Sequence, residues 1–159
     1  MVTLQIIFIS FLFSCASNQI QNNSPLADAY FKLGTEQLQN EEYDKAVLTL
    51  NKVLEINSQY AEAYLNRGIA YKQEGNYDQA ISDYGRVLGM DPKDVRAYCN
   101  RGNVYVEKGL YDQAISDYSK ALKMNPRLAI VYYDRGMAYY LKGEYRKSWE
   151  DVWPTRLKS

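Results

Sequence analysis

Apolar and polar positions along most of the chain recur at helical spacing, in blocks separated by short breaks. Within residues 61–94, small and aromatic residues recur at i, i+4 and i+7 as far as Tyr71. Gly75 then interrupts the pattern, and Tyr77 begins a second periodic run. Pro92 ends that run, because proline cannot continue the helical hydrogen-bond ladder. This block therefore predicts two helices joined by a short turn.

The same block occurs four times with a period of 34 residues. The string Tyr-Asp-Gln-Ala-Ile-Ser-Asp-Tyr stands at 77–84 and again at 111–118. Small residues and helix-ending prolines recur at matching places, namely Gly34, Gly68, Gly102 and Gly136, then Ala46, Ala80 and Ala114, and finally Pro92 and Pro126. The chain thus divides into copies at residues 27–60, 61–94, 95–128 and 129–159, of which the last is incomplete.

This spacing of glycine, alanine, aromatic residues and proline resembles the tetratricopeptide repeat (TPR). The resemblance implies an all-α solenoid of four helix-turn-helix repeats that coils into a right-handed superhelix, with its last repeat truncated. The chain departs from the pattern near its ends: Gln37 and Ser58 replace an aromatic residue and the proline in the first copy, and Pro154 interrupts the last helix.

The chain contains 16 tyrosines and only four phenylalanines. Most of the tyrosines stand at repeat places that pack between paired helices, so we interpret them as core residues rather than as a ligand-binding stripe. Tyr60, Tyr133 and Tyr140 fall outside those places and are better candidates for a contact surface.

Comparison of the four copies with one another predicts ion pairs between the two helices of a repeat. The first copy has Leu33 at its seventh place and Thr49 at its twenty-third, whereas every other copy has arginine and aspartate there. Because the two charges appear together or not at all, we predict three inter-helix pairs: Arg67 with Asp83, Arg101 with Asp117, and Arg135 with Asp151.

The TPR resemblance also implies a concave face, lined by the first helix of each repeat, that holds a protein or peptide partner. We predict that this groove includes Asn66, Ile69, Arg96, Asn100, Asn103, Tyr133, Asp134, Met137 and Tyr140. Asparagines can satisfy a peptide backbone, while the tyrosines and methionine offer an adaptable apolar patch. Any single asparagine is also compatible with a solvated helix face. The carboxylate clamp of chaperone-binding relatives is disfavoured, because Phe31, Thr35 and Asn100 supply no cation.

Composition excludes several kinds of chemistry. The chain has no histidine, so Ser-His and Cys-His nucleophiles and histidine-ligated metals are ruled out. It has 19 basic and 19 acidic residues, which argues against nucleic-acid binding. Cys99 has no cationic neighbour in the sequence to activate its thiol. We therefore predict a protein that is not an enzyme and has no cofactor.

The N-terminal residues 1–27 carry no charged side chain, and residues 6–13 form an almost unbroken apolar run. This run is shorter than the roughly 20 residues of a transmembrane helix and matches a signal-peptide core. Leu12-Phe13-Ser14-Cys15 then resembles the lipobox of bacterial lipoproteins. The resemblance implies a signal peptide at 1–14, acyl chains on Cys15 that anchor the protein to a membrane, and a polar tether at 15–26.

The residue after the cysteine is Ala16 and not aspartate, which in such lipoproteins favours the outer over the inner membrane of a bacterial envelope. A buried apolar segment with a chance cysteine is the alternative, and the protein would then be cytoplasmic. Taken together, the sequence predicts a lipid-anchored scaffold or adaptor that binds a protein partner. A self-associating repeat protein, which is a homo-oligomer or a fragment of a larger array, is the alternative function.

Overall fold

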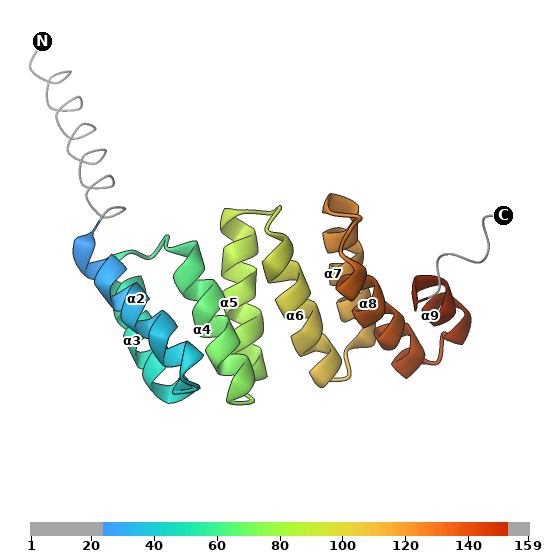
Figure 1. Ribbon diagram of the computed structural model, residues 1–159, viewed down its shortest axis with the longest axis horizontal. Coiled ribbons are helices and arrows are strands. Elements are labelled where there is room, and N and C mark those ends of the chain that lie inside the picture. The colour runs from blue at the N-terminus through green and yellow to red at the C-terminus, as the bar shows by residue number, and fades with distance from the viewer. Residues whose placement is uncertain (1–23, 153–159) are drawn as a thin grey trace, which may run out of the picture.

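The computed structural model describes residues 24–152, and this part of the chain is helical apart from short turns (Figure 1). Its helices form four consecutive antiparallel pairs, one for each copy of the repeat, which confirms the predicted all-α solenoid. The pairs are α2 (Pro25–Gln39) with α3 (Tyr43–Ile56), α4 (Ala61–Gln73) with α5 (Tyr77–Met90), α6 (Val95–Glu107) with α7 (Tyr111–Met124), and α8 (Ala129–Lys142) with α9 (Tyr145–Val152).

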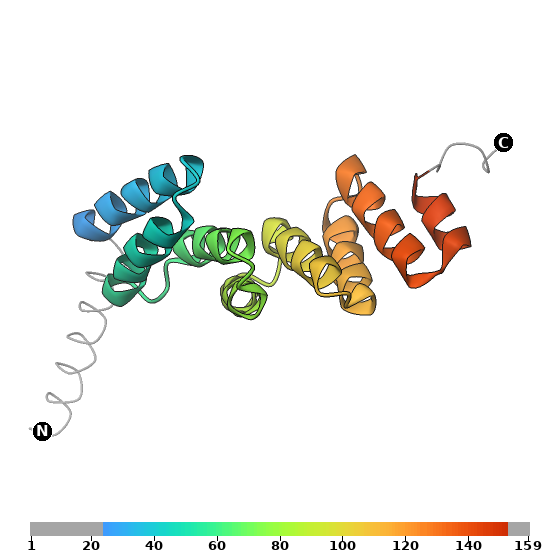
Figure 2. The same ribbon diagram turned by 90° about the horizontal axis from the view of Figure 1, so that it is seen from below.

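The helix pairs stack side by side into an elongated molecule (Figure 2). Each second helix contacts the first helix of the following repeat, so every helix packs on its neighbours in sequence. The successive first helices α2, α4, α6 and α8 also contact one another, whereas no comparable contact joins the second helices within residues 24–152. The first helices therefore form the more tightly curved inner face of the solenoid.

Within each pair, the repeated glycine lies where the two helices approach most closely. A Cβ atom placed on Gly68 would lie 2.7 Å from Cε1 of Tyr84, and one on Gly102 would lie 2.7 Å from Cε1 of Tyr118. Both tyrosines are fully buried. The glycine is thus required by packing, because any side chain at this place would overlap the ring of the partner helix.

Tight turns join the two helices of each repeat. Gly75, Gly109 and Gly143 adopt φ values of 78°, 71° and 88°, in the left-handed region that glycine enters without steric cost. The first repeat has Glu41 in this conformation, at φ 61°. The turn geometry is therefore the same in all four repeats, although only three of them have glycine.

The turns between repeats share a side-chain hydrogen bond that the sequence comparison did not single out. Oδ1 of Asn57, Asp91 and Asn125 accepts a hydrogen bond from the backbone N–H two residues later, at 2.9, 2.9 and 3.1 Å. The first of these turns forms with Ser58 in place of proline. The Asn or Asp residue, which all three turns share, is therefore the more general stop signal.

Helix α2 begins at Pro25, before the predicted start of the first copy at residue 27, because proline is well tolerated in the first turn of a helix. Helix α9 is described as far as Val152, and Pro154 lies outside the described residues. The predicted signal peptide, Cys15 and most of the polar tether also lie outside them. Between residues 24 and 152, none of the helices is both long and apolar enough to span a membrane.

Candidate functional site

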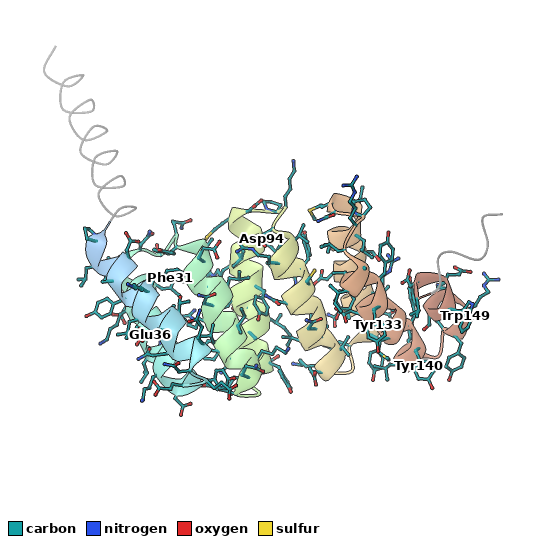
Figure 3. All side chains as sticks on the ribbon, viewed as in Figure 1. Phe31, Glu36, Asp94, Tyr133, Tyr140 and Trp149 are labelled. Carbon is teal, nitrogen blue, oxygen red and sulfur yellow. The ribbon has the colours of Figure 1, made fainter. Side chains whose placement is uncertain are left out.

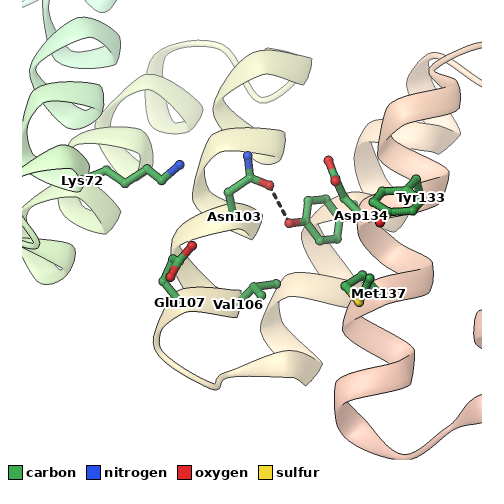
Figure 4. Close-up of a pocket in the computed structure, with 8 residues that line it drawn as sticks. Lys72, Asn103, Val106, Glu107, Tyr133, Asp134 and Met137 are labelled. Atoms are coloured by element: carbon green, nitrogen blue, oxygen red, sulfur yellow. Dashed lines mark hydrogen bonds between the residues drawn. The ribbon is translucent and has the colours of Figure 1, made fainter. Parts of the chain in front are cut away.

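The inner face of the solenoid contains a hollow of about 220 Å³ between α4, α6 and α8 (Figure 4). Lys72 and Glu107 lie on one side of it, and Tyr133, Asp134 and Met137 lie on the other. Asn103, Val106 and Tyr118 complete the lining. The hollow therefore depends on three successive repeats and exists only because they stack.

A hydrogen bond between two helices fixes one wall of this hollow. The hydroxyl of Tyr118 on α7 donates to Oδ1 of Asn103 on α6, at 2.6 Å. Burial is the main cause that raises the pKa of Tyr118, so the hydroxyl stays protonated as a donor. Because Oδ1 accepts this hydrogen bond, the amide N–H groups of Asn103 remain as donors.

The second repeat lacks this hydrogen bond. Tyr84 is the counterpart of Tyr118, and its buried hydroxyl has no partner among residues 24–152. The place of Asn103 is taken there by Ile69, whose side chain cannot accept a hydrogen bond and packs against the core instead. Helices α5 and α7 therefore share the sequence that contains this tyrosine, but they pack against first helices, α4 and α6, that differ at the facing place.

Asp134 carries the hollow's most strongly desolvated carboxylate. Burial raises the pKa of this carboxyl above its usual range, and the charge of Lys72 opposes the shift without forming an ion pair. Within residues 24–152, the carboxylate has neither a hydrogen-bond partner nor an ion-pair partner. It is therefore available to a ligand.

Cys99 is partly buried on α6, close enough to Asp134 to be influenced by its charge. Burial, followed by the charges of Asp134, Asp117 and Asp94, raises the pKa of its thiol to about 11. The thiol is protonated at neutral pH, so it lacks the thiolate that a nucleophile needs.

The structure brings four of the nine predicted groove residues together at this hollow: Asn103, Tyr133, Asp134 and Met137. Tyr140 projects from the same helix but packs edge-on against Tyr145, with ring centroids 5.3 Å apart. Figure 3 shows Tyr133 and Tyr140 on α8. The apolar patch predicted on α8 is therefore divided between the hollow and the contact with α9.

Asn66 and Arg96, two of the other predicted groove residues, have side-chain partners outside the hollow. Asn66 donates to Oγ1 of Thr35 at 3.0 Å and so connects α4 with α2. Arg96 forms ion pairs with Glu62 and Asp94, at 2.7 and 2.8 Å. Asn100 is partly buried and, like Ile69, does not line the hollow.

Tyr118 was predicted as a core residue with its hydroxyl toward solvent, and not as part of the groove. Its ring is in the core, and its hydroxyl reaches the hollow from the second helix of the repeat. The available signal was the pairing of a tyrosine at this place with asparagine on the first helix, which occurs in the third repeat but not in the second.

The three predicted arginine–aspartate pairs are in contact, each through two parallel hydrogen bonds. Arg67 Nε and Nη2 donate to Asp83 at 2.8 and 2.7 Å, and the pairs of Arg101 with Asp117 and Arg135 with Asp151 have the same geometry. The carboxylates are nearly buried, with 5, 3 and 10% of their side chains exposed. Such bidentate pairs hold the two helices of a repeat in register.

Two of these arginines also reach the preceding repeat. Arg67 Nη1 donates to Asn51 on α3 at 2.6 Å, and Arg135 Nη1 donates to Ser119 on α7 at 3.0 Å. At the equivalent place before Arg101 the chain has Gly85, which offers no side-chain acceptor. The arginines therefore connect repeats as well as helices, and the connection is incomplete between the second and third repeats.

The site contains no arrangement typical of metal chemistry. Within residues 24–152, no three or more acidic or cysteine side chains are grouped so that they could hold a metal ion. The donors and acceptors of the hollow suit hydrogen bonding and ion pairing with a ligand.

Comparison with known protein families identifies the family of the repeats. The family model described as TPR repeat matches residues 34–75, 70–109 and 102–143, which together cover more than half of the chain. The chain belongs to the TPR repeat family. This TPR chain therefore has the repeat that its period of 34 residues predicts.

Solved structures agree with the TPR assignment. One described as the crystal structure of MamA is 24% identical, with a TM-score of 0.77, and the match covers 86% of this chain and 80% of that one. The Arabidopsis OM64 TPR domain is 24% identical, with a TM-score of 0.69, and the match covers 72% of this chain and 94% of that domain. No curated protein sequence matches this TPR chain.

A third similar structure is that of Pseudomonas aeruginosa pilF, which is 24% identical, with a TM-score of 0.71. The match covers 79% of this chain and 58% of that one. At this level of identity, the structures establish the fold. Membership of the TPR family supports a protein-interaction scaffold, and repeats of this family are generally not catalytic.

Proposed function

We propose that this TPR chain holds an extended segment of a partner protein along α4, α6 and α8. The hollow between these helices carries the proposal, because it combines unengaged polar groups with exposed apolar side chains on the inner face. Tyr133 and Met137 are exposed at its edge, and the amide nitrogen of Asn103 donates to no side chain within residues 24–152. Such a surface fits a peptide backbone flanked by apolar side chains.

A photo-crosslinker placed at Met137 tests this proposal in intact cells. We expect benzoylphenylalanine at this position to capture a partner protein after illumination. The matched control carries the same group at Glu55, which is exposed on α3, a second helix. A partner captured equally from both positions, or from neither, would contradict binding in the groove.

We also propose that acyl chains on Cys15 anchor the protein to a bacterial membrane, with the outer membrane favoured over the inner. The support is sequence alone: the apolar run at 6–13, the small residue before the cysteine and the uncharged tether that follows. Cys15→Ala should move the protein to the soluble fraction and abolish palmitate incorporation. Cys99→Ala is the control, because it removes the other cysteine and should leave both unchanged.

Self-association is a second candidate function, and the charge distribution favours it. Residues 27–94 contain 7 basic and 12 acidic side chains, whereas residues 95–159 contain 12 basic and 7 acidic ones. Tyr145 and Trp149 are also exposed on α9, at the basic end of the molecule. Head-to-tail contacts would bring opposite charges together, and such contacts need not close into a ring.

Sedimentation velocity at low and high salt tests this second candidate. Electrostatic head-to-tail association predicts oligomers that dissociate as the salt concentration rises, because screening weakens attraction between exposed charges. A monomer at both salt concentrations would exclude the candidate while leaving partner binding unaffected.

A further inference from the structure

The hollow between α4, α6 and α8 combines an aromatic ring with a carboxylate at adjacent places, which no other repeat does. The places of Tyr133 and Asp134 hold Phe31 and Lys32 in the first repeat, Leu65 and Asn66 in the second, and Cys99 and Asn100 in the third. The carboxylate and the ring come from adjacent positions of α8 (Figure 4). These differences identify one position along the inner face as specialised.

Charge is the first property that restricts the ligand. The lining contains one cation, Lys72, and two carboxylates, Glu107 and Asp134, so that its net charge is negative. Lys72 forms no ion pair with Asp134 among residues 24–152. Asp117, the other carboxylate near the hydroxyl of Tyr118, is already paired with Arg101 and adds little to this charge. The hollow therefore favours a cation over an anion.

Shape and apolar surface are the second property. Val106 and Met137 line the hollow between the polar groups, where they can cover the methylene stem of a long side chain. The ring of Tyr133 is half exposed beside Asp134 and offers an aromatic face to a positive charge. Asn103 adds amide donors for a backbone carbonyl of the same segment.

We propose that the hollow receives a lysine or arginine side chain from the bound partner segment. Its charged end pairs with Asp134 beside Tyr133, and its stem lies over Val106 and Met137. The inference rests on the proposed function, because it specifies one side chain of a segment that the groove must first hold.

Selection from a random dodecapeptide library displayed on phage tests the inference with the full chain in nonionic detergent. We expect enrichment of peptides that carry lysine or arginine next to apolar residues. Asp134→Asn should abolish this basic preference and weaken binding of an enriched synthetic peptide about tenfold, as expected for a lost charge-assisted hydrogen bond. Replacing the peptide's basic residue with glutamine should cause a similar loss.

The variant is matched to the fold, because asparagine already occupies this place in two other repeats as Asn66 and Asn100. Glu55→Gln, on α3, is the control for loss of one exposed carboxylate and should leave binding unchanged. Enriched peptides without a basic residue, or basic peptides that bind the Asp134→Asn variant equally well, would overturn the inference but not the proposed groove. If no peptide is enriched, the proposed groove is itself wrong.

Discussion

The helix pairs α2–α3 and α6–α7 have the same antiparallel packing but different side chains between their helices. In the first pair, Leu50 covers Gly34 and the places of the ion pair hold Leu33 and Thr49. In the third, Tyr118 covers Gly102, and Arg101 is bonded to Asp117. The difference shows that small residues and helical spacing suffice for the packing of a pair. The tyrosine and the ion pair are not needed for this packing, but they supply the polar contacts between α6 and α7.

The largest expected effect comes from breaking one ion pair from one side. Arg101→Leu leaves the nearly buried carboxylate of Asp117 without its bidentate partner and should cost about 3 kcal/mol of unfolding free energy. Arg101→Leu together with Asp117→Thr recreates the pair of residues in the first repeat and should cost much less. Urea unfolding followed by circular dichroism measures both, and equal losses would contradict the interpretation.

The next effect concerns the close approach at the repeated glycine. Gly102→Ala places a Cβ atom 2.7 Å from the rigid ring of Tyr118 and should destabilise by about 2 kcal/mol, a typical cost of overpacking. Gly89→Ala is the control, because a Cβ atom there meets nothing within 4 Å. The control should stabilise α5 slightly, since alanine favours helix more than glycine does. The urea midpoints of the two variants should therefore move in opposite directions.

A smaller effect separates the two buried tyrosines. Tyr118→Phe removes the hydrogen bond to Asn103 and should cost about 1 kcal/mol. Tyr84→Phe removes a buried hydroxyl that has no partner within residues 24–152, so its stability should be unchanged or slightly higher. Equal losses in thermal unfolding of the two variants would show that the two hydroxyls have the same environment.

An effect of similar size but opposite sign, a gain of stability, is expected at the incomplete connection between the second and third repeats. A Cβ atom on Gly85 would lie 4.0 Å from Nη1 of Arg101, so Gly85→Ser brings a hydroxyl within reach of the guanidinium. It would reproduce the bond that Ser119 makes with Arg135. With the better helix propensity of serine, we expect a gain of about 1 kcal/mol in the unfolding free energy. A loss of stability would contradict this expectation.

Much of the fold could be predicted because the four copies of the repeat can be compared with one another. Four copies of one pattern reveal which places vary together, and this predicted the aspartate partners of Arg67, Arg101 and Arg135 without reference to any other protein. The site was predicted less completely. Arg96 and Asn66 stand at places that face the groove, but they bond to Glu62 and Thr35 on neighbouring repeats. A pattern within one repeat does not include such contacts.

The sequence by itself determined the helix pairs, the glycine that lets them approach and the residues that pair across them, because these depend on spacing within about 34 residues. Only the tertiary structure decided that Lys72, Asn103 and Asp134 surround one hollow, and that the hydroxyl of Tyr118 reaches it while that of Tyr84 has no partner among the described residues. The physical reason is that the distance between first helices of different repeats results from small rotations summed along the solenoid. No local pattern of apolar and polar residues specifies that sum.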